Sequence, residues 1–256
     1  MTIHSLCRFG LMTKETTFVL KSAQDGNDFK DIDSKIYEAA MASSRDHANR
    51  LLLEIKKRFQ VNDVFLPALH DLKLIARSSL SSLVKSQVYF VYLYHADEIV
   101  AHVTDKLGDI YIAKIGDPRI DRDDIKGILE NYLKATGANA SAKAIRNWVG
   151  RYLSIMREVN LLIRKKASEY MLYFLGIQPE TWAIFTIAAH FAGYPIEQGI
   201  FYKAFQIRPA FVSKLLEGMR VVKSVTYKIN GENNETSRVT LETSTSSLKQ
   251  WLEEYT

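Results

Sequence analysis

The chain has very little cysteine, because Cys7 stands alone among 256 residues. A single thiol excludes an intrachain disulfide and a zinc site built from cysteines of this chain. Long apolar runs are also missing, since the most apolar stretch, 88–93, falls far short of the about 18 to 20 residues that cross a bilayer. The first residues lack the apolar centre of a signal peptide. We therefore expect a cytoplasmic protein without a membrane partner.

Motifs of the common enzyme classes are missing too. No G-x-G-x-x-G, G-x-S-x-G or H-E-x-x-H occurs, and the segment 108–117 lacks the lysine of a P-loop. His95 and His102 lie seven residues apart, a spacing for which packing is a better explanation than a zinc site. The acids at 121–124 are spaced as in the first turn of a helix, where they complement the helix dipole. We predict no catalytic residue, no cofactor and no metal site.

What the chain does contain is an ordinary globular composition, with 47% hydrophobic and 25% charged residues. Apolar residues recur at the three and four spacing of amphipathic helices over much of its length. The best-defined case follows Ser141, a good helix cap, with an unbroken apolar stripe from Ile145 to Val159. The predicted helices cover 13–22, 32–42, 43–60, 63–76, 82–106, 121–133, 141–162, 181–192, a short segment ending near 205, 209–219 and 246–255.

Strand signals are fewer. Alternating residues at 221–229, the turn signal at Asn230 and Gly231, and a second run at 237–243 predict a β-hairpin. The segment 161–177, which the basic cluster Arg164, Lys165 and Lys166 interrupts, is a candidate strand pair or extended wing.

The order of these elements predicts a mainly α fold. Three helices followed by a hairpin, as expected over 181–243, is the order of a winged helix-turn-helix, in which the last helix enters a DNA groove. The small-residue run 136–142 reads as a linker. We therefore expect a helical N-terminal subdomain at 1–135 and a winged-helix-like C-terminal subdomain, with its small hairpin, at 141–256.

The net charge is +5, and it is unevenly distributed. The segment 143–166 contains seven basic residues and one acid, and 203–228 contains six basic residues and one acid, whereas 97–130 contains nine acids and five basic residues. Cations that converge on one surface bind duplex DNA through counterion release, without reading bases. The other explanation is that they form the solvated faces of amphipathic helices. The candidate DNA-binding residues are Lys143, Arg146, Arg151, Arg157, Lys165, Lys166, Lys203, Arg208, Lys214, Arg220, Lys223 and Lys228.

The chain contains the stretches CRFGLMTKET, ASSRDHANRLLLEIKKRF, QVYFVYLYHADEIVAHV and SAKAIRNWVGRYLSIMREVNLL. On these features the whole chain resembles the BrxA family of BREX bacteriophage-exclusion systems. The resemblance implies a small helical protein with a winged-helix-like portion that binds double-stranded DNA and has no catalytic activity. It also implies a genetic association with a DNA methyltransferase, so other BREX components such as that methyltransferase are candidate partners. On this chain it points to the basic face of the 141–162 helix.

Together these observations predict a non-enzymatic accessory protein of an anti-phage defence system that binds duplex DNA mainly through phosphate contacts. Two alternatives stay open. The acidic middle and basic ends also suit a protein-interaction adaptor within a defence complex, and a basic helical protein can bind structured RNA instead.

Overall fold

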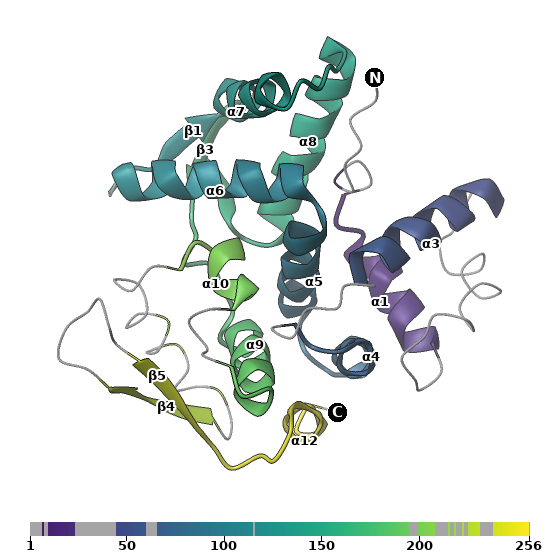
Figure 1. Cartoon of the computed structure of the whole chain (residues 1–256), viewed down its shortest axis with the longest axis vertical. Coiled ribbons are helices and arrows are strands. Elements are labelled where there is room, and N and C mark those ends of the chain that lie inside the picture. The colour runs from purple at the N-terminus through teal and green to yellow at the C-terminus, as the bar shows by residue number, and fades with distance from the viewer. Residues whose placement is uncertain are drawn as a thin grey trace.

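The computed structural model describes residues 7, 10–23, 45–59, 66–114, 116–194, 199–207, 215, 218, 222, 225–230 and 238–255. Over these residues the chain is mainly helical, as predicted, with ten helices, one three-stranded sheet and one two-stranded sheet (Figure 1). No helix in the described ranges is long and apolar enough to cross a membrane. The helix expected at 32–42 lies outside the described residues, and so does most of the helix expected at 209–219.

The helices largely follow the predicted apolar spacing. Their bounds are α1 Thr13–Ser22, α3 Arg45–Phe59, α4 Leu69–Arg77, α5 Ser82–Ala96, α6 Glu98–Ala113, α7 Arg122–Ala135, α8 Ala142–Glu158, α9 Pro179–Phe191, α10 Ile200–Ala204 and α12 Leu248–Glu253. Helix α4, expected at 63–76, begins at Leu69, where the carboxylate of Asp71 accepts a hydrogen bond from the Ala68 amide at 3.2 Å and so satisfies a backbone donor at the start of the helix.

Helix α5 forms the centre of the core. Every residue from Val84 to Tyr94 is buried, so this helix is covered on all sides, which fits its nearly uniform apolar character. It contacts α1, α3, α6, α8, α9 and α10. The N-terminal helices and the later elements therefore pack around one shared helix.

The prediction of a single helix over 82–106 is wrong, because the chain breaks at Asp97. Asp97 has extended backbone angles, and its carboxylate accepts hydrogen bonds from the amides of Ile99 (3.1 Å) and Val100 (3.2 Å). It therefore caps α6 and ends α5. The same carboxylate accepts a bond from the Cys7 amide at 3.2 Å. Apolar periodicity continues across this position and hides the break.

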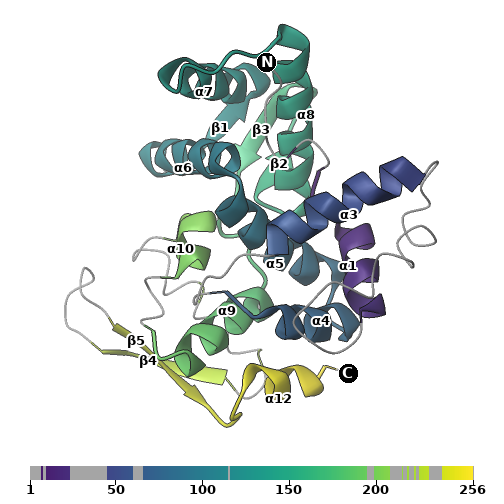
Figure 2. The same cartoon turned by 45° about the vertical axis from the view of Figure 1, so that its right-hand side comes forward.

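A three-stranded antiparallel sheet lies beside α6, α7 and α8 (Figure 2). Its strands are β1 Arg119–Asp121, β2 Leu162–Arg164 and β3 Glu169–Leu172, in the order β1-β3-β2. Strands β2 and β3 confirm the strand pair expected within 161–177. Strand β1 precedes the run 136–142 and pairs with β3, which follows it. The division of the chain at that run stays a prediction, and this sheet joins residues from both sides of it.

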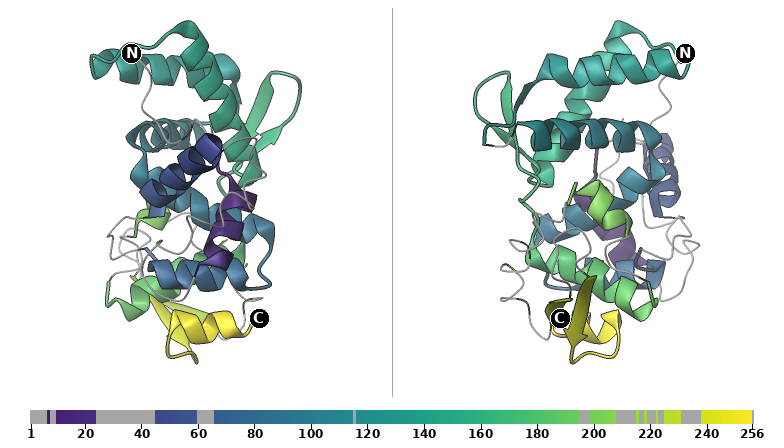
Figure 3. Two further views of the ribbon diagram at one scale, coloured as in Figure 1. Left: turned by 90° about the vertical axis from the view of Figure 1, so that its right-hand side faces the viewer. Right: turned by 60° about the vertical axis from the view of Figure 1, so that its left-hand side comes forward.

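The second sheet consists of β4 Val225–Asn230 and β5 Arg238–Thr243, paired antiparallel with Val225 opposite Thr243. This pairing confirms the hairpin predicted at 221–243. It lies at the end of the molecule opposite the three-stranded sheet, next to α12 (Figures 1 and 3).

Candidate nucleic-acid interface

Helix α8 is the most strongly amphipathic long helix near the sheet, and its inner face is fixed by packing. Ser141 caps it by accepting a hydrogen bond from the Ala144 amide at 3.2 Å. Trp148 and Tyr152 stack one turn apart, with ring centroids 5.1 Å from each other. The Tyr152 hydroxyl lies 2.9 Å from that of Thr104 on α6, and burial raises the pKa of Tyr152. These contacts fix the rotation of α8 about its own axis.

The outer face of α8 is basic. Lys143, Arg146, Arg151 and Arg157 are all exposed, and at 100° per residue they fall within about 140° of the helix circumference. We call these four residues the α8 basic face. Arg157 donates from Nε to the carbonyl of Leu153 in the preceding turn, at 3.3 Å. The structure therefore gathers on one side four of the cations that the sequence nominated.

The only acid of the 143–166 segment is held at the end of this helix. The carboxylate of Glu158 accepts a hydrogen bond from the hydroxyl of Thr13 on α1. Packing between α1 and α8 thereby engages the only acidic side chain of α8.

Beyond α8 the chain forms a short hairpin, β2–β3, that projects from the body of the molecule (Figure 3). We call Arg164, Lys165 and Lys166, which are exposed at its end, the hairpin tip. Arg164 donates to the backbone carbonyls of Lys166 (3.2 Å) and Ala167 (3.1 Å) and so closes the turn. Among the described residues, Lys165 has no acidic partner, whereas Lys166 lies 3.9 Å from Glu169.

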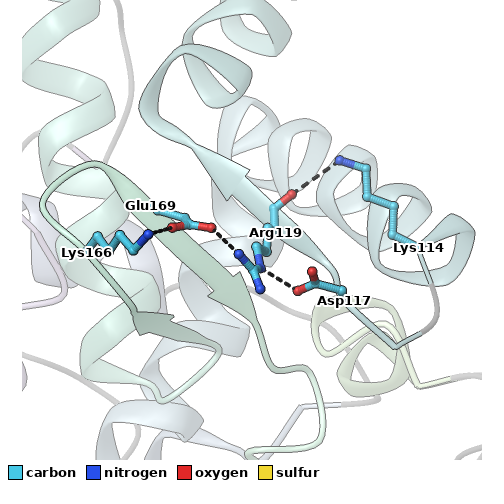
Figure 4. Close-up of polar contacts among 5 residues, drawn as sticks. All are labelled: Lys114, Asp117, Arg119, Lys166 and Glu169. Atoms are coloured by element: carbon cyan, nitrogen blue, oxygen red, sulfur yellow. Dashed lines mark hydrogen bonds and ion pairs between the residues drawn. The ribbon is translucent and has the colours of Figure 1, made fainter.

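An ion pair between Arg119 and Glu169 ties β1 to the tip end of the hairpin (Figure 4). Arg119 donates to Asp117 at 2.6 Å and to Glu169 at 2.8 Å, and Lys114 donates to the Arg119 carbonyl at 3.3 Å. The hydrogen bonds to Asp117 and Glu169 raise the pKa of Arg119. Such exposed pairs contribute little to stability. Their consequence is geometric, because Glu169 holds both Arg119 of β1 and Lys166 of the hairpin tip.

Of the remaining nominated residues, the structure places the side chain of only Lys203. Lys203 is exposed on α10, which packs against α5 and α6 and lies on the other side of α6 from α7 (Figures 1 and 2). Five others lie outside what the structure describes, at least for their side chains: Arg208, Lys214, Arg220, Lys223 and Lys228.

Sequence reasoning missed Arg122. This residue begins α7, and its Nη2 donates to the carbonyl of Arg146 on α8 at 3.0 Å. In the sequence it lies within the acidic segment 97–130. Residue spacing alone could not have predicted its contact with α8, because that contact depends on how α7 and α8 pack.

Two of the residues considered as metal ligands have structural roles. Asp121 caps α7 by accepting from the amides of Asp123 (2.7 Å) and Asp124 (2.9 Å), as its position in a first turn predicted. The ring of His102 packs on Tyr132 at a centroid distance of 4.8 Å. Across the described ranges, no group of three or more histidine, cysteine or acidic side chains is arranged to hold a metal ion.

Comparisons of the chain with family models, curated proteins and solved structures returned no match. A functional interpretation therefore depends on the geometry above and on the sequence resemblance.

Proposed function

We propose that this protein binds duplex DNA without catalysing a reaction, and that helix α8 and the β2–β3 hairpin form the binding surface. The observation that carries the proposal is the order α6, β1, α7, α8, β2, β3 together with the sheet order β1-β3-β2. A helix pair followed by a hairpin in a small antiparallel sheet is the arrangement of a winged helix-turn-helix. In that motif the second helix of the pair enters the major groove.

This assignment puts the winged helix at 98–172 rather than at 181–243. Helix α8 would be the recognition helix, and the hairpin tip would be the wing. The basic residues nominated from the sequence at 143–166 fall on those two elements. Their charge supports the assignment because phosphate neutralisation supplies most of the affinity of sequence-independent DNA binding.

The wider role follows from the resemblance to the BrxA family. We propose that the protein is an accessory component of a BREX anti-phage defence system, with other components such as the DNA methyltransferase as partners. The adaptor hypothesis keeps one observation in its favour, which is the exposed ion-pair network of Asp117, Arg119 and Glu169 next to the hairpin.

The test is a titration of a defined duplex of about 25 base pairs over a series of salt concentrations. The α8 basic face would make four phosphate contacts and the hairpin tip two. Six contacts predict a slope near −5 when the logarithm of the association constant is plotted against the logarithm of the salt concentration, which is about a thousandfold loss of affinity between 50 and 200 mM salt. Scrambling the duplex sequence should change the affinity little. An affinity that does not depend on salt contradicts the proposal.

Two further arms separate the alternatives. If structured RNA competes better than duplex DNA of equal length, the RNA-binding hypothesis is favoured. If the protein co-purifies with a methyltransferase but the free protein ignores DNA at 50 mM salt, the adaptor hypothesis replaces this one.

A further inference from the structure

Arg122 stands between acids in the sequence, yet it does not pair with them. Its neighbours are Asp121, Asp123 and Asp124, and in the described structure its guanidinium donates to the Arg146 carbonyl instead. The reason lies in the helix cap. Asp121 accepts from two backbone amides, and Asp124 accepts from the Asp121 amide at 2.7 Å. Two of the three carboxylates are therefore turned toward the backbone.

The position that Arg122 reaches on α8 is a gap in the row of cations. Arg146, Gly150 and Arg157 fall within about 40° of one another around the helix axis, and Gly150 has no side chain to offer. A Cβ built on Gly150 would lie 3.3 Å from Nη2 of Arg122. The guanidinium of Arg122 therefore occupies the place that a side chain at 150 would take.

This placement leaves most of the guanidinium available. Arginine has five N–H donors, the contact with the Arg146 carbonyl uses Nη2, and the residue is exposed. Along α8 the row of cations is therefore Arg146, Arg122 beside Gly150, and Arg157. The helix rises about 6 Å from residue 146 to 150 and about 10 Å from 150 to 157. Three guanidinium groups from two helices line one side of α8.

We infer that Arg122 is a DNA-contacting residue that helix α7 supplies to the α8 basic face, where it binds the phosphodiester backbone. The inference rests on the proposed function. It assigns to the binding surface a residue, Arg122, that the sequence places in the acidic segment 97–130. It predicts that full affinity requires α7 and α8 to stay packed together.

The test compares three variants of the full chain in the same salt titration. R122A should lose about one unit of log–log slope and bind about fivefold more weakly at 100 mM salt, as for one lost phosphate contact. R122K retains the charge and should keep a slope close to the wild type. The control is K126A, which removes an equal charge from the same helix, where Lys126 pairs with Glu130 at 3.7 Å, and which should leave the slope unchanged.

The outcomes separate the inference from the function on which it rests. If the wild type shows the steep slope but R122A matches K126A, the inference fails and the proposed function stands. If the wild type does not bind duplex at 50 mM salt, both fail. A thermal melt accompanies each variant, since a purely structural role would lower the melting temperature of R122A without changing its slope.

Discussion

Gln87 holds together the elements that meet behind α8, and replacing it should strongly destabilise the protein. It is fully buried on α5. Its Nε2 donates to the carbonyls of Val159 (2.9 Å) and Gly176 (2.8 Å), and its Oε1 accepts from the Gln178 amide (2.9 Å) and the Thr181 hydroxyl (2.8 Å). One side chain thereby joins the end of α8, the segment after β3 and the start of α9.

Gln87→Leu preserves the approximate size of the side chain but removes all four hydrogen bonds. At about 1 kcal/mol for each bond, the free energy of unfolding should fall by about 4 kcal/mol. That loss is a large part of the about 5 to 15 kcal/mol that stabilises a typical domain. Thr181→Val is the matched control, because it removes one of the four bonds and should cost about 1 kcal/mol.

Urea unfolding followed by far-UV circular dichroism measures both variants. The reasoning is refuted if Gln87→Leu unfolds within 1 kcal/mol of the wild type, or if Thr181→Val costs as much as Gln87→Leu.

Three smaller changes test other parts of the account. Asp97→Ala removes the cap of α6 and the partner of the Cys7 amide, and should lower the free energy of unfolding by about 1 to 2 kcal/mol in the same urea assay. Ser141→Ala should cost about 1 kcal/mol and fray the first turn of α8, which amide hydrogen exchange at Ala144 would reveal; unchanged exchange would contradict the capping role. Lys165→Ala should reduce the salt slope of duplex binding by about one unit, and an unchanged slope would remove the hairpin tip from the interface.

The sequence predicted the local structure of the second half of the chain well, because the signals there are local. Ser141 and the apolar stripe that follows it define α8, and the Asn230–Gly231 pair with its flanking alternation predicted the pairing of β4 with β5. The segment at 161–177 was only a candidate strand pair, since Arg164, Lys165 and Lys166 interrupt its apolar pattern. Its partner, β1, is three residues long, too short to carry a periodic signal.

The candidate site was harder to derive, because it depends on contacts between distant parts of the chain. The cations of α8 share a face by helical spacing alone, so the sequence could group them. Arg122 and Lys203 show the limit of that reasoning. Arg122 belongs to an acidic segment but contacts the α8 backbone, whereas Lys203 belongs to a basic segment but lies on α10, away from the α8 basic face.

The central claim is that the outer face of α8 touches DNA, and site-specific photo-cross-linking tests it most directly. A photoreactive residue at Ser154, which is exposed on that side of α8, should cross-link to a bound duplex. The same residue at Lys249, exposed on α12 at the opposite end of the molecule, should not. Cross-links from position 249 without any from position 154 would contradict the account.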